Sequence, residues 1–166
     1  MRRLAAVALA LALLPACFGP DPNVTEEGKG KPLLTIEFPE TVSRGSVETA
    51  TLTIDNPGPG DMGSVVVAFA TAGVAGASGP LPAELVPLTS SSENPMIESI
   101  TPEPREVSDD GVLYVFDGLE EGASREISFD IRVPEEPGPA ANSVSVYAGE
   151  DADRIKGLLL RTVVTG

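Results

Sequence analysis

The feature that most constrains the fold of this chain is a period of two in its apolar residues. In the clearest case Ala50, Leu52 and Ile54 alternate with threonines and an aspartate. A second stretch alternates in the same way from Ile127 to Val133. Successive side chains of a strand point to opposite faces of the sheet. Each stretch therefore predicts a strand with one face in a core and a polar face in water.

Turn residues separate these stretches from other segments that have the composition of strands. The residues from Asn56 to Asp61 read Asn-Pro-Gly-Pro-Gly-Asp, which predicts a turn. The segment from Ser64 to Thr71 is apolar on both faces and is expected to be a central strand. Further strands are expected at residues 33–38, 112–116, 143–147 and 158–164, with shorter ones at 85–88 and 96–100.

The composition supports many short strands joined by turns rather than helices. The 166 residues include 17 Gly and 16 Pro, and no convincing helical pattern follows the N-terminal segment. We therefore expect an all-β protein, an immunoglobulin-like β-sandwich of seven to nine strands. A β-barrel is the alternative.

The N-terminal segment differs from the rest of the chain because it holds a basic start and an uninterrupted apolar run. Arg2 and Arg3 precede the run, which extends from Leu4 to Leu14. A membrane-spanning helix needs about 20 apolar residues, so this run is too short to span a bilayer. Its length is typical of the apolar part of a signal peptide, and residues 1–16 are expected to be one.

The apolar run ends in Leu14-Pro15-Ala16-Cys17, which holds the only cysteine of the chain. This sequence resembles a bacterial lipobox, although Pro15 departs from the preferred Ala or Ser. The resemblance implies that the Cys17 thiol receives a diacylglycerol and that a signal peptidase cuts between Ala16 and Cys17. The acylated Cys17 would then anchor an extracytoplasmic lipoprotein to the cell membrane or the outer membrane. An ordinary secretory signal followed by a buried cysteine is the alternative.

The remaining residues divide into a tether and one domain. Residues 17–32 are rich in Pro, Gly and charge without apolar periodicity, which predicts a flexible linker behind the lipidated N-terminus. Residues 33–166 are expected to form the sandwich, and about 130 residues suffice for a hydrophobic core.

Five motifs follow one another along residues 33–166. They are the turn at Asn56-Pro57-Gly58-Pro59, the run Val65-Val66-Val67, the aromatic strand Tyr114-Val115-Phe116, the connection from Gly118 to Gly122, and the strand from Phe129 to Pro134. This order resembles a family of immunoglobulin-like repeats in bacterial surface proteins whose function is unknown. The resemblance implies a sandwich module without catalytic residues. Such repeats often occur in tandem, whereas one copy is found here.

Charge and the lack of histidine narrow the function further. The net charge is −14, and it becomes −16 without Arg2 and Arg3, from 9 basic and 25 acidic residues. A surface this acidic disfavours nucleic acid and anionic lipid headgroups, and it favours a soluble monomer. The chain has no histidine, the commonest general base. We expect a non-enzymatic envelope protein whose sandwich is a structural or protein-binding module.

Carboxylates gather at two places in the sequence. Asp109 and Asp110 form the first group, and Glu150, Asp151 and Asp153 form the second. Calcium takes such oxygen ligands, so a calcium-dependent or other small-ligand-binding lipoprotein is the alternative function. Neither group has the spacing of an EF-hand, and both lie where polar turns are expected. No cofactor is therefore expected.

The segment from Gly58 to Gly63 also matches the pattern Gly-x-Gly-x-x-Gly of dinucleotide-binding proteins. That function requires a helix directly after the glycines, because the helix N-terminus holds the pyrophosphate. The run Val65-Val66-Val67 follows instead, and Pro59 removes an amide donor. We expect a turn here and no dinucleotide site.

Overall fold

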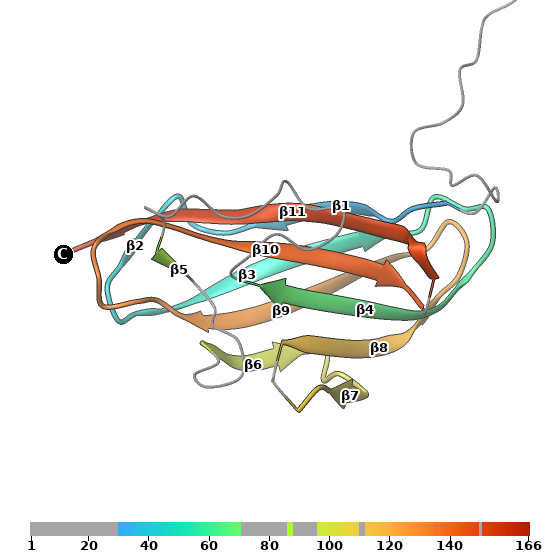
Figure 1. Cartoon of the computed structure of the whole chain (residues 1–166), viewed down its shortest axis with the longest axis horizontal. Coiled ribbons are helices and arrows are strands. Elements are labelled where there is room, and N and C mark those ends of the chain that lie inside the picture. Colours follow the sequence, from blue (N-terminus) through green and yellow to red (C-terminus); the bar gives the residue numbers. More distant parts are fainter. Residues whose placement is uncertain (1–29, 71–85, 88–95, 110–111, 150) are drawn as a thin grey trace, which may run out of the picture.

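The computed structural model describes residues 30–70, 86–87, 96–109, 112–149 and 151–166. These residues contain eleven strands and no helix (Figure 1). The strands are β1 (Leu33–Glu37), β2 (Thr41–Ser43), β3 (Val47–Asp55), β4 (Met62–Ala70), β5 (Val86–Pro87), β6 (Ile97–Thr101), β7 (Glu106–Val107), β8 (Leu113–Leu119), β9 (Ser124–Arg132), β10 (Gly138–Ala148) and β11 (Asp151–Thr165).

The strands form two sheets that pack face to face. The smaller sheet has the order β1-β3-β9-β6, and the larger has the order β2-β11-β10-β4-β8-β7, with β5 beside β10. Both sheets end in edge strands, so the described residues form an open sandwich and not a closed barrel. The predicted immunoglobulin-like β-sandwich is confirmed. Eight strands have five or more residues, and the others, β2, β5 and β7, have two or three.

The expected strands are found, but their lengths differ. The strand expected from Ser64 to Thr71 is β4, which lies centrally between β10 and β8 as predicted. β10 and β11 are much longer than expected, because their antiparallel ladder runs from Gly138 paired with Val164 to Ala148 paired with Asp151. Cross-strand hydrogen bonding extends β10 through Gly, Pro, Ala and Asn residues and β11 through Asp, Ala, Lys and Gly residues, all of low strand propensity.

The core lies between the sheets and contains the apolar residues of the alternating stretches. Ala50, Leu52 and Ile54 have no exposed surface, while the threonines between them face outward as predicted. Three aromatic rings pack edge to face at the centre: Phe69 lies 4.8 Å from Phe129 and 6.1 Å from Tyr114, between ring centroids. Phe69 and Tyr114 belong to the larger sheet and Phe129 to the smaller, so these contacts join the two layers.

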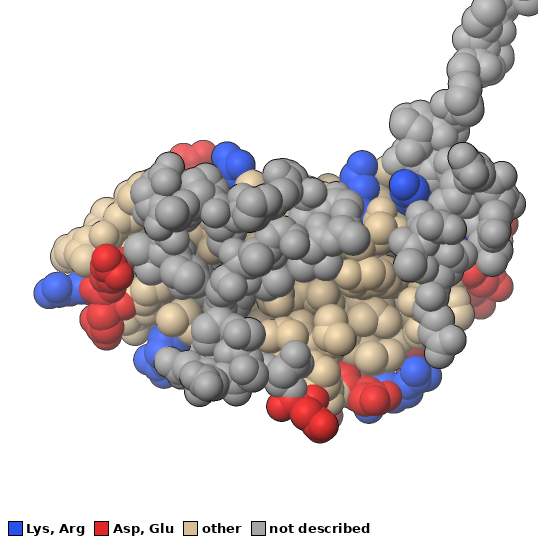
Figure 2. Space-filling model, viewed as in Figure 1, with Lys and Arg blue, Asp and Glu red and all other residues tan. Residues whose placement is uncertain are grey.

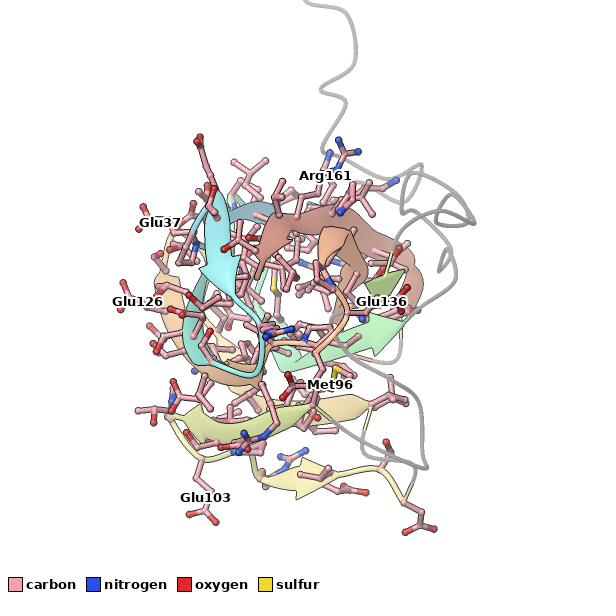
Figure 3. All side chains as sticks on the ribbon, turned by 90° about the vertical axis from the view of Figure 1, so that its left-hand side faces the viewer. Glu37, Met96, Glu103, Glu126, Glu136 and Arg161 are labelled. Atoms are coloured by element: carbon pink, nitrogen blue, oxygen red, sulfur yellow. The ribbon has the colours of Figure 1, made fainter. Side chains whose placement is uncertain are left out.

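The first two strands lie in different sheets. β1 pairs with β3 in the smaller sheet, and β2 pairs in parallel with the end of β11 in the larger. The chain crosses between them at Pro39, whose carbonyl oxygen accepts a hydrogen bond from Thr162 Oγ1 at 2.7 Å. This crossing covers one side of the sandwich. On the opposite side lie the edge strands β6 and β7, which residues 102–105 connect across the two sheets (Figure 3).

Candidate functional site

The end of the sandwich at which the chain enters the fold is held by a buried arginine. Arg154 of β11 is 4 % exposed. Its Nε donates to the carbonyl oxygen of Gly30 at 2.7 Å, and its Nη1 donates to that of Asp61 at 3.2 Å. Nη2 is buried without a partner among the described residues. The guanidinium thus fixes Gly30 to the turn before β4.

Gly30 approaches the same turn so closely that no side chain fits. A Cβ atom on this residue would lie 1.6 Å from the carbonyl oxygen of Gly58. Any other residue at position 30 would push the two backbones apart, so the entry point depends on glycine. The C-terminus lies at the other end of β11 (Figure 1). At about 3.3 Å per residue, Arg154 and Thr165 are separated by roughly 36 Å along the strand.

The turn from Asn56 to Asp61 is organised by the side chain of Asn56, which is 1 % exposed. Its Nδ2 donates to the carbonyl oxygens of Gly60 and Leu119, both at 3.0 Å, and its Oδ1 accepts from the Gly58 amide at 3.1 Å. Gly58 and Gly60 have φ angles of 80° and 82°, which favour glycine. The expected turn is therefore found, and it is tied to the connection between β8 and β9.

The glycine-rich motif in this turn leads into a strand and not a helix. β4 begins at Met62, within the motif itself. A further contact occupies the turn, because Glu121 Oε2 accepts a hydrogen bond from the Gly60 amide at 2.8 Å. The motif therefore builds a turn, as the sequence predicted.

The structure does not bring the two predicted carboxylate groups together. Asp109 is exposed just before β8, and Asp151 and Asp153 belong to β11. β8 and β11 are separated in the larger sheet by β4 and β10. Within the described residues no group of three or more acidic, Cys or His residues could hold a metal ion. Asp110 and Glu150 lie outside those residues, as do the predicted cleavage and lipidation residues Ala16 and Cys17.

The outer faces of the two sheets differ in polarity. The smaller sheet presents a Thr- and Ser-rich face with carboxylates, and Figure 3 shows Glu37 and Glu126 pointing outward from it. The carboxylate of Asp130 on this face accepts hydrogen bonds from Ser99 and from Thr49, and these bonds lower its pKa below the ordinary value. On this face of the molecule, the Lys, Arg, Asp and Glu residues that are visible beside the grey atoms lie around the margin (Figure 2).

A groove lies on the side of the sandwich formed by β6 and β7, which are edge strands of the two different sheets. We call this the edge groove. It has a volume of about 370 Å³ and is lined by Ile97, Glu98, Ser99, Ile100, Glu103, Pro104, Val107 and Tyr114. Its apolar residues come from β6, β7 and β8, and its carboxylates stand at β6 and at the connection to β7. Figure 3 shows Glu103 on that connection, pointing away from the core.

The sequence did not predict the edge groove or the role of Arg154. The groove exists because β6 and β7 end different sheets, and this depends on strand order. Arg154 binds residues 124 and 93 positions away in the sequence. The sequence offered one indication of this role. Arg154 directly follows the second carboxylate group, and an arginine at such a place can donate hydrogen bonds to buried carbonyl oxygens.

The chain has similarity to known proteins among solved structures. No family model matches the chain, and no curated protein matches it. Among solved structures, the CARDB domain of the PF1109 protein from Pyrococcus furiosus, solved in complex with di-metal ions, has a TM-score of 0.46 and 15 % identity, covering 86 % of this chain and 92 % of that one. A PapD-like domain of human CEP192 has a TM-score of 0.39 and 13 % identity, covering 99 % and 97 %.

A third similar structure is the bacterial hydrophobin BslA. Its TM-score is 0.46 at 10 % identity, covering 83 % of this chain and 98 % of that one. In the part of the chain that the structure describes, no helix is long and apolar enough to cross a membrane.

Proposed function

We propose that this protein is a non-enzymatic, lipid-anchored protein of the bacterial cell envelope whose sandwich is a protein-binding module. The observation that carries the proposal is the N-terminal sequence, in which the only cysteine of the chain ends a signal-like apolar run at Leu14-Pro15-Ala16-Cys17. The acylated Cys17 holds the protein at the cell membrane or the outer membrane, and the domain acts there as a monomer.

The structure supports this arrangement through the position of the entry point. Residues 17–29 separate Cys17 from Gly30 and span at most about 45 Å when fully extended. Gly30 lies at one end of the sandwich, where Arg154 holds it. The chain therefore enters the domain end-on. The strands β6 and β7 lie on a long side of the sandwich and not at that end (Figure 1).

The chemistry of the chain supports binding rather than catalysis. Without histidine, neither a Ser-His nor a Cys-His pair can form. Asp109 precedes β8 and Asp151 and Asp153 belong to β11, and β4 and β10 lie between those two strands in the larger sheet. An open strand edge beside a groove is, in contrast, a common surface for binding an extended peptide.

Processing in cells tests the anchor. Globomycin, which blocks the lipoprotein signal peptidase, should make the uncleaved precursor accumulate. A Cys17→Ser variant should lose both its acyl label and its sedimentation with membranes. The matched control is Pro15→Ala, which restores the preferred residue and should be processed at least as efficiently as the wild type. A Cys17→Ser protein that still fractionates with membranes as before would overturn the anchor.

A further inference from the structure

The strand β6 presents an open edge on the surface. It pairs with β9 along one side, from Ile97 opposite Ile131 to Thr101 opposite Ser128. No strand in the described ranges pairs with its other side, since β6 ends the smaller sheet. The backbone groups along such an edge are a template for another strand. The sequence Ile-Glu-Ser-Ile-Thr contains neither the lysine nor the proline that commonly protects an edge, and its pairing with β9 is irregular between Ile97 and Ser99.

The edge groove continues the inner face of that edge. Ile97 and Ile100 are half-buried on β6, Val107 is 47 % exposed on β7, and Tyr114 closes the floor at 3 % exposed. The volume of about 370 Å³ lies within the 300–1,000 Å³ typical of ligand sites. A strand added to β6 would place every second side chain against these apolar residues, because strand side chains alternate between faces.

The charge around the edge is acidic. Residues 96–109 contain four carboxylates, Glu98, Glu103, Glu106 and Asp109, against the single cation Arg105, a net charge of −3. Glu98 forms an ion pair with Arg132 on the outer side of β6, and Glu103 is exposed at the rim of the groove. The side chains of an added strand that point outward would therefore lie beside carboxylates.

We infer that the edge groove binds an extended segment of a partner protein in which apolar residues alternate with Lys or Arg. The segment adds to β6 as a fifth strand of the smaller sheet. Its apolar side chains fill the groove, and its basic side chains lie beside Glu98 and Glu103. The inference rests on the proposed function, because it names the surface and the class of partner of that binding module.

A synthetic peptide serves as the probe. The full mature protein, purified in a non-ionic detergent, is titrated by calorimetry with a capped peptide of sequence Lys-Val-Lys-Val-Lys-Val-Lys. Two control peptides accompany it. One groups the four lysines before the three valines, which keeps the charge but removes the alternation. The other carries proline in place of the central valine, which removes an amide donor from the strand. We expect both controls to bind at least about tenfold more weakly, a difference of about 1.4 kcal/mol.

Protein variants locate the site. Val107→Asp places a charge in the groove and should weaken binding of the alternating peptide about tenfold or more. The matched control is Val47→Asp at the start of β3, which changes a valine of similar exposure, 44 %, on the outer face of the smaller sheet and should leave binding unchanged. Glu103→Lys, an exposed change with little effect on folding, should also weaken binding and reduce its dependence on salt.

The peptide experiment tests the edge groove independently of the lipid anchor. Equal affinity of the alternating and grouped peptides would reduce the interaction to general charge attraction and overturn it. Unchanged affinity of both Val107→Asp and Glu103→Lys would place the peptide elsewhere and overturn it as well. Neither result affects acylation of Cys17. Conversely, loss of the anchor leaves the peptide titration unchanged.

Discussion

The Nε atom of Arg154 donates a hydrogen bond to the carbonyl oxygen of Gly30 at a distance of 2.7 Å. The bond joins β11 to Gly30, the residue at which the described part of the fold begins. Because Arg154 is buried, water cannot replace this contact without cost. The same guanidinium reaches the carbonyl oxygen of Asp61. One side chain therefore determines how the sandwich is attached to whatever precedes it.

Replacing Arg154 with methionine should free this end of the domain. The variant leaves two carbonyl oxygens without their charged donor, while removing the cost of burying a cation. We expect a net loss of about 1–2 kcal/mol in the free energy of unfolding, measured by urea denaturation. Limited proteolysis should also cut faster between Gly30 and β1. Arg161→Met, at an exposed position of the same strand, is the control and should change neither quantity.

Replacing Asn56 with alanine should destabilise the turn before β4. The buried amide makes two donor bonds and one acceptor bond, and alanine leaves all three backbone partners without it. We expect a loss of about 3 kcal/mol, measured as a lower denaturation midpoint in urea. Thr53→Ala, on the outer face of the preceding strand, should cost well under half as much. Equal effects of the two substitutions would contradict the role of Asn56.

The pH dependence of stability should reveal the hydrogen bonds of Asp130. Ser99 and Thr49 lower its pKa in the folded protein below the ordinary value of 3.8. The folded protein therefore holds the ionised form more strongly than the unfolded chain does. The stabilisation is fully present above pH 3.8 and is lost as the pH falls through the lower folded pKa.

The Asp130→Asn variant provides the measurement. Its melting temperature should lie below that of the wild type at pH 6, and the difference should shrink as the pH falls below 3.8. Glu126→Gln on the same strand removes a carboxylate with the same effect on net charge and serves as the control. A difference that stays constant down to pH 2 would show that the hydrogen bonds do not favour ionised Asp130.

Calcium should not stabilise the domain. A site filled at 100 times its dissociation constant would add about 2.7 kcal/mol to the free energy of unfolding. Asp109 precedes β8, whereas Asp151 and Asp153 belong to β11, and β4 and β10 lie between those two strands in the larger sheet. We expect equal melting temperatures in millimolar calcium and in excess chelator. A higher melting temperature in calcium than in chelator would instead support the ion-binding alternative, provided that the difference disappears in an Asp151→Asn variant.

A strand could be predicted from the sequence where buried and exposed residues alternate along it. The alternation from Thr49 to Asp55 marks β3 and its outward threonines, because one buried face produces a period of two. The lengths of β10 and β11 were not predictable, since Gly138 and Asp151 join their strands only through the ladder between them. β2 and β7 were missed because two or three residues are too few to show a period.

The candidate site was less predictable than the fold. The two sides of the edge groove, Ile97 on β6 and Val107 on β7, belong to different sheets. Their proximity depends on the order of strands, which the sequence pattern leaves open. That either carboxylate group binds calcium stays a prediction: Asp109 precedes β8, Asp151 begins β11, and Asp110 and Glu150 lie outside the described residues.

The sequence by itself determined that this chain forms strands, which residues are buried in the alternating strands β3 and β9, and that residues 56–61 form a turn. These properties depend on neighbouring residues, because side-chain alternation and turn chemistry act over a few positions. Only the tertiary structure decided that Arg154 holds Gly30 and that β6 and β7 leave an open edge with a groove. These relationships join residues far apart in the chain, and they follow from the order in which the strands pair across two packed sheets.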